Sequence, residues 1–161
     1  MLYPLLIILI LLAIIVFQDF KTRSIHWITL PPLFLALYFF PLDITNQFDV
    51  LQNFFFLVLI FAFMSLYLRF RQNEWVNPTK DFFGWGDILF LIAITPTTYF
   101  RNFMFLFIFG TIFSLLFSIF LKIFNKNFST IPYAGMFSIF MFFYLIYKHF
   151  HPNFSFDKLL H

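Results

Sequence analysis

The chain has 161 residues, of which 62% are hydrophobic and only 11% are charged, and its formal net charge is +3. Soluble domains carry about 25% charged residues, and a protein of this size cannot hide so much apolar surface in one core. The composition therefore excludes an ordinary soluble protein and predicts an integral membrane protein with one domain, residues 1–161, and no soluble domain. The cations bear on orientation in the bilayer, so we expect no nucleic-acid partner. The absence of cysteine excludes disulfides, thiolate metal sites and cysteine nucleophiles.

Six apolar runs follow one another along the chain, and they predict about six transmembrane helices. A span needs about 20 residues, so the first, fifth and sixth runs fit well and the other three need flanking residues or tilt. The first run lacks the basic start and cleavage site of a signal peptide, which predicts a retained span. The predicted fold is an all-α polytopic membrane protein, and Pro31-Pro32 are expected to interrupt its second run. The runs are Leu2–Phe17, Trp27–Phe40, Phe54–Leu68, Ile88–Ile94 with an alternative start at Phe82, Phe103–Phe120 and Ile131–Tyr147.

The basic residues predict the orientation of these spans. Lys and Arg gather in cytoplasmic loops, and six spans place three loops on one side of the membrane. Those three loops carry seven cations and the other side carries three. We therefore expect loops one, three and five in the cytoplasm and both termini outside. The seven cations are Lys21, Arg23, Arg69, Arg71, Lys80, Lys122 and Lys126, and the other three are Arg101, Lys148 and Lys158.

Two acids at the ends of apolar runs are the main functional clue. Asp19 closes the first run and Asp87 opens the fourth, which places both at the predicted cytoplasmic side. Acids at the edge of the hydrocarbon are costly and are functional-site candidates by default. Asp19 lies near a helix C-terminus, where its charge opposes the helix dipole, so capping does not explain it. A salt bridge to Lys21 or Arg23 is the structural alternative for Asp19.

Two glycines precede Asp87 in the string Gly84-Trp85-Gly86-Asp87. The structural alternative for Asp87 is a helix N-cap, because Asp is a preferred capping residue and suits the positive helix end. Gly84 and Gly86 favour a tight site, since glycine permits close approach of a substrate or of another helix. No metal-ligand spacing or cofactor fingerprint is visible, so we expect neither a metal nor a cofactor.

Paired carboxylates can hydrolyse an amide bond. Two close carboxylates cannot both ionise easily, so they share a proton. One aspartate takes a proton from water as the water attacks the carbonyl, and the other gives a proton to the departing amine. The pair titrates as a unit, so the roles of Asp19 and Asp87 are not assigned individually.

At these residues the chain resembles the type IV prepilin peptidases and preflagellin peptidases, a family of membrane aspartic proteases. Three places carry the resemblance: Asp19 with Lys21, Arg23 and Ile25; the Gly-x-Gly-Asp segment; and Ile131-Pro132-Tyr133-Ala134, which is similar to the family's Ile-Pro-Phe-Gly segment. The resemblance implies that Asp19 and Asp87 are catalytic at the cytoplasmic face. It also implies a prepilin-like substrate, whose short basic leader is removed from an apolar helix.

The chain departs from the family pattern at three positions. His26 and Trp27 stand where the family often has Pro and Asn, and Leu89 stands where it often has Lys, so substrate preference and activity are open. The N-terminal segment with paired cysteines, which the larger bacterial enzymes use for N-methylation of the product, is not seen. We therefore expect a peptidase without methyltransferase activity.

Two other functions compete with a prepilin peptidase. The chain can be a non-catalytic membrane subunit or a degenerate relative whose aspartates join helices by hydrogen bonds. A protease of the presenilin type also uses Gly-x-Gly-Asp, but its acids lie deep in adjacent spans, whereas Asp19 and Asp87 lie at run ends. The lipid bilayer is an expected partner, and the oligomeric state and the identity of the substrate stay open.

Overall fold

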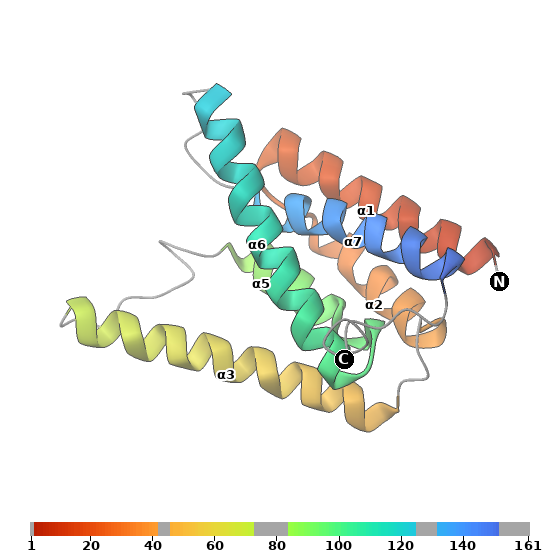
Figure 1. Cartoon of the computed structure of the whole chain (residues 1–161), viewed down its shortest axis with the longest axis horizontal. Coiled ribbons are helices and arrows are strands. Elements are labelled where there is room, and N and C mark those ends of the chain that lie inside the picture. Colours follow the sequence, from red (N-terminus) through yellow and green to blue (C-terminus); the bar gives the residue numbers. More distant parts are fainter. Residues whose placement is uncertain (1, 42–45, 73–83, 125–131, 152–161) are drawn as a thin grey trace.

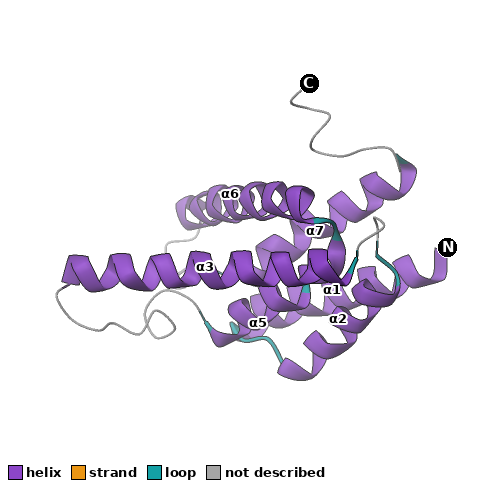
Figure 2. Ribbon diagram, turned by 90° about the horizontal axis from the view of Figure 1, so that it is seen from below, coloured by secondary structure: helices purple, strands orange, loops and turns teal. Residues whose placement is uncertain are grey.

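A computed structural model of the chain contains six α-helices and two short 3-10 helices within residues 2–41, 46–72, 84–124 and 132–151, which are the residues that the structure describes. No strand occurs among these residues (Figure 2). The all-α prediction is therefore confirmed. The elements are α1 (Leu2–Thr22), η1 (Trp27–Thr29), α2 (Leu30–Phe39), α3 (Gln47–Gln72), α5 (Trp85–Ala93), η2 (Thr95–Thr97), α6 (Phe100–Phe124) and α7 (Tyr133–Phe150).

One helix start differs from the prediction, and another lies between the two starts that the sequence left open. Pro31 and Pro32 do not interrupt a helix, because they occupy its first turn, where a missing N–H costs nothing. The helix α5 begins at Trp85, so Asp87 lies in its first turn. The third run is part of a longer helix, because α3 continues through polar residues on both sides of it.

The helix α7 lies at the centre of the bundle, between α1 and α6 (Figure 1). α1 packs most extensively on α7 through one face, on which Ile8, Leu12, Ile15 and Asp19 are buried. Their spacing of three or four residues follows the helical repeat, so a single seam of α1 faces the bundle. Asp19 is the last member of this seam and is the only charged one.

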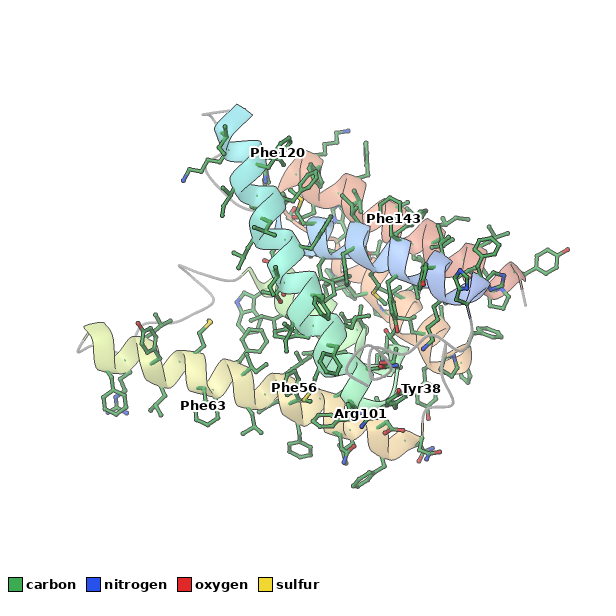
Figure 3. All side chains as sticks on the ribbon, viewed as in Figure 1. Tyr38, Phe56, Phe63, Arg101, Phe120 and Phe143 are labelled. Carbon is green, nitrogen blue, oxygen red and sulfur yellow. The ribbon has the colours of Figure 1, made fainter. Side chains whose placement is uncertain are left out.

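The outer surface of the bundle is apolar, as a lipid environment requires. Three helices are long and apolar enough to cross a membrane, namely Tyr3–Thr22, Gln47–Phe70 and Phe100–Ile123, whereas α2 and α5 are shorter. Large aromatic side chains point away from the bundle, among them Phe63, Phe120 and Phe143 (Figure 3). Soluble proteins rarely expose so much continuous apolar surface, so the chain is a membrane protein.

A buried amide ties α3 to the connection between α5 and α6. The Asn53 side chain is fully buried, and its Nδ2 donates to the carbonyl oxygens of Thr95 (2.8 Å) and Thr98 (2.9 Å). The two carbonyls lie at the turn around Pro96, where the helical hydrogen-bond ladder is broken. Asn53 therefore holds the far end of α5, the helix that carries Asp87.

Candidate active site

Asp19 lies in the last turn of α1, with its side chain only 5% exposed. Its Oδ2 accepts a hydrogen bond from the backbone N–H of Gly135 at 2.6 Å. A carboxylate bound to a backbone N–H at this distance makes a strong, charge-assisted hydrogen bond. This hydrogen bond ties the carboxylate of Asp19 to the backbone of α7.

Asp87 occupies the third position of α5 and is not the N-cap residue, so the capping alternative is correct only in part. The N-cap position belongs to Gly84, whose N–H donates to Oδ2 of Asp87 at 3.2 Å. The second oxygen, Oδ1, accepts a hydrogen bond from the N–H of Ala134 at 3.1 Å. Asp87 thus closes the first turn of its own helix with one oxygen and contacts α7 with the other.

The two carboxylates meet at the first turn of α7. Ala134 and Gly135 are consecutive residues, and their N–H groups bind Asp87 and Asp19 respectively. The first N–H groups of a helix have no partner inside the helix, and the positive end of the helix dipole favours negative charge. The start of α7 therefore holds side by side two acids that are 68 residues apart in the sequence.

Asp87 precedes the apolar run Ile88–Ile94 and lies outside the three long apolar helices. Burial raises the pKa of the Asp87 carboxyl from 3.8 to about 6, and the charge of Asp19 also raises it. The hydrogen bonds from Ala134 and Gly84 act in the opposite direction, but burial dominates. Asp87 therefore keeps its proton to a higher pH than an exposed aspartate does.

Glycines at the site leave room for close approach, as Gly84-Trp85-Gly86 predicted for its own segment. A Cβ on Gly86 would lie 3.4 Å from Cβ of Ile25, so α5 packs tightly on the segment after α1. A Cβ on Gly84 would lie 3.3 Å from Oδ2 of Asp87. What approaches Gly86 is thus a part of the same chain, and a contact of Gly84 or Gly86 with substrate stays a prediction.

Gly135 was missed at the level of the sequence. A Cβ there would lie 3.0 Å from Oδ2 and 3.1 Å from Cβ of Asp19, so only glycine lets α1 and α7 approach this closely. The available signal was its position directly after Tyr133-Ala134, at the end of the segment that resembles Ile-Pro-Phe-Gly.

Two neighbouring residues of α6 fix the position of α7. The Tyr133 hydroxyl is hydrogen-bonded to Oγ1 of Thr111 at 3.0 Å. One turn later, the ring of Phe137 packs over Gly110, where a Cβ would come within 2.5 Å of the ring. These contacts position the first turn of α7, and with it the two N–H groups that bind the aspartates.

The positions at which the chain departs from the family pattern lie just after α1 and within α5. The backbone N–H of His26 donates to Oε1 of Gln18 at 3.2 Å, which folds the segment after α1 back onto the helix. Trp27 and Leu89 are exposed. Among residues 2–41, 46–72, 84–124 and 132–151, no three His, Asp or Glu side chains are grouped so that they could hold a metal ion. Residues 73–83, including Glu74 and Asp81, lie outside the described part.

This arrangement defines a class of protein: a helical membrane protein in which two aspartates from distant helices share one anchoring turn. The sequence model of the type IV leader peptidase family matches residues 6–119, which is more than half of the chain and includes Asp19 and Asp87. The chain belongs to the type IV leader peptidase family. No curated protein and no solved structure gave a significant match.

Proposed function

We propose that the protein is an aspartic endopeptidase that removes the short basic leader of prepilin-like proteins at the cytoplasmic face of the membrane. The observation that carries this proposal is the convergence of Asp19 and Asp87 on consecutive N–H groups of α7. Membership of a peptidase family supports the reaction class, and the two carboxylates supply groups that can perform it.

In the proposed mechanism the two carboxyl groups share one proton. The unprotonated carboxylate removes a proton from water while the water oxygen attacks the carbonyl carbon of the leader peptide bond. The protonated carboxyl then gives its proton to the leaving amine nitrogen as the C–N bond breaks. The N–H groups of Ala134 and Gly135 keep the carboxylates oriented throughout, and no metal or cofactor takes part.

The directions of the helices support the expected orientation of the protein in the membrane. The C-terminal ends of α1, α3 and α6 and the N-terminal ends of α5 and α7 point to the left or upper left of Figure 1. Lys21, Arg69 and Lys122 lie at these helix ends. These three described cations lie on the side of the aspartates, which supports the proposal that the site of a multi-pass inner-membrane protein faces the cytoplasm.

Leader cleavage tests the proposal directly. A prepilin-like precursor from the same genome is co-expressed with the wild type, Asp19→Asn, Asp87→Asn or the control Asp49→Asn, and the precursor mass is followed. Asp49 caps the start of α3 by accepting the N–H of Asn46, far along the chain from either catalytic candidate, so its variant should cleave normally. We expect both site variants to lose cleavage while inserting as well as the wild type.

The same mass measurements also distinguish a peptidase from a methyltransferase and from a non-catalytic subunit. A product shortened by the leader but carrying no extra methyl group is expected, because the chain has no cysteine of the kind linked to methylation by the family resemblance. Cleavage that survives both Asn substitutions would show that the two-aspartate mechanism is wrong. The alternative of a non-catalytic subunit is favoured by the hydrogen bonds themselves, and it predicts poor insertion of both variants and no cleavage by the wild type.

A further inference from the structure

A groove of about 570 Å³ runs along the outer face of α1, away from the aspartates. Its wall is apolar over about two turns, where Ile10, Ile14 and Phe17 follow one another at helical spacing. Its far end is polar and basic, with Lys21 and His26 in the lining. The backbone N–H of His26 donates to Oε1 of Gln18 at 3.2 Å, so His26 is tied to the helix at this end of the groove.

The groove and the paired acids lie on opposite sides of α1. Each residue advances the direction around a helix by about 100°, so Asp19 points about 180° away from the face that Ile10, Ile14 and Lys21 share. Asp19 is buried against α7, whereas Ile10 is 58% exposed. A peptide in the groove would be separated from both carboxylates by the helix itself, which argues against a substrate segment as its occupant.

The lining instead matches the chemistry of a membrane lipid. The candidate span Tyr3–Thr22 ends one residue after Lys21, which places this side chain where lipid phosphates meet the hydrocarbon. The ammonium of Lys21 lies 5.2 Å from the centre of the Phe17 ring, so the cation is held beside the apolar wall. From Ile10 to Phe17 the wall runs about 10 Å along the helix axis, in the direction that a lipid chain takes.

We propose that this groove binds one anionic phospholipid of the surrounding membrane. Its acyl chain lies along Ile10, Ile14 and Phe17, and its phosphate is bound by the ammonium of Lys21 and an imidazole N–H of His26. The charge of the basic end selects an anionic over a zwitterionic headgroup. This inference does not depend on peptidase activity.

Lipid retention tests the proposal on the full chain. The protein is placed in nanodiscs of equal parts phosphatidylglycerol and phosphatidylcholine, released into mild detergent and examined by native mass spectrometry. We expect one retained lipid, mainly phosphatidylglycerol, and about fivefold less retention in Lys21→Ala, as the loss of one interfacial cation implies. Lys122→Ala is the matched control, because Lys122 is an exposed lysine in the last turn of another long apolar helix.

A second variant tests the apolar wall without changing charge. Ala13 also lines the groove, so Ala13→Phe should fill it and displace the lipid, whereas Ile112→Phe on the exposed face of α6 should not. Three results would overturn the proposal: retained lipid with the composition of the nanodisc, equal loss in Lys21→Ala and Lys122→Ala, or full retention in Ala13→Phe. The first would show that the groove does not select an anionic headgroup, and the second would leave only general attraction of anionic lipid to a basic protein.

Discussion

Gly135→Ala tests the geometry of the site at its tightest contact. The new Cβ would lie 3.0 Å from Oδ2 and 3.1 Å from Cβ of Asp19, whereas ordinary van der Waals contacts begin at 3.4 Å. The seam between α1 and α7 must therefore open by about half an ångström to admit the methyl group. The same movement lengthens the 2.6 Å hydrogen bond from Gly135 to Asp19.

The size of the effect follows from that displacement. A misplacement of 1 Å costs about a hundredfold in rate, so a shift of about half that size should lower kcat/KM about tenfold. Overpacking costs about 1–3 kcal/mol, and the better helix propensity of alanine returns up to about 1 kcal/mol. Gly135→Ala should therefore remain folded while losing most of its activity.

The assay is leader cleavage in membranes with equal amounts of wild type, Gly135→Ala and the control Ser138→Ala. Ser138 lies one turn further along α7, and its buried hydroxyl has no hydrogen-bond partner among the described residues. Its removal should leave activity unchanged. If Gly135→Ala cleaves within twofold of the wild type, the N–H of Gly135 does not position Asp19 for the reaction and that part of the reasoning is wrong.

Three further predictions concern charge and packing. The pKa of Asp87 is raised to about 6 in the folded protein, whereas the unfolded chain releases this proton above about pH 4. The free energy of unfolding should therefore fall as pH rises through 6. Asp87→Asn should remove much of this pH dependence in thermal unfolding scans in detergent. Gly110→Ala places a Cβ 2.5 Å from the Phe137 ring, and it should destabilise the protein by about 1–3 kcal/mol in the same scans, whereas an unchanged Tm would refute the close α6–α7 contact. Asn53→Leu removes the donor to two buried carbonyls and should cost about 1–3 kcal/mol per unsatisfied group, with equal stability to the wild type as the contradicting result.

The sequence was sufficient to predict the helical class and the two acids, because apolar runs and charges at their ends are local properties. It predicted less about short elements. Pro31 and Pro32 break a helix in its interior but begin one in its first turn, and the hydropathy of the run does not distinguish these positions. The uniform apolarity of α1 likewise conceals which face is buried, since a seam is visible only where polarity contrasts across the helix.

The partners of the acids could not be predicted, because they are backbone groups. Every residue except proline carries a backbone N–H, so the roles of Ala134 and Gly135 as donors depend on where α7 begins and how it packs. The sequence shows that residue 135 is a glycine, but it does not show that Asp19 is the residue that approaches it closely. The groove on α1 is equally hidden, because it depends on which face of α1 the bundle leaves uncovered and on where His26 lies beside the helix end.

The anchoring of both acids by α7 has a consequence for biosynthesis. Asp19 belongs to the first helix and Asp87 to a middle one, yet the N–H groups that hold them belong to the last helix that the structure describes. A nascent chain emerging from the ribosome therefore carries two acids without their anchor until α7 has entered the bilayer and docked on α1. Under the proposed function, the site is therefore complete only after α7 has docked on α1 and α5.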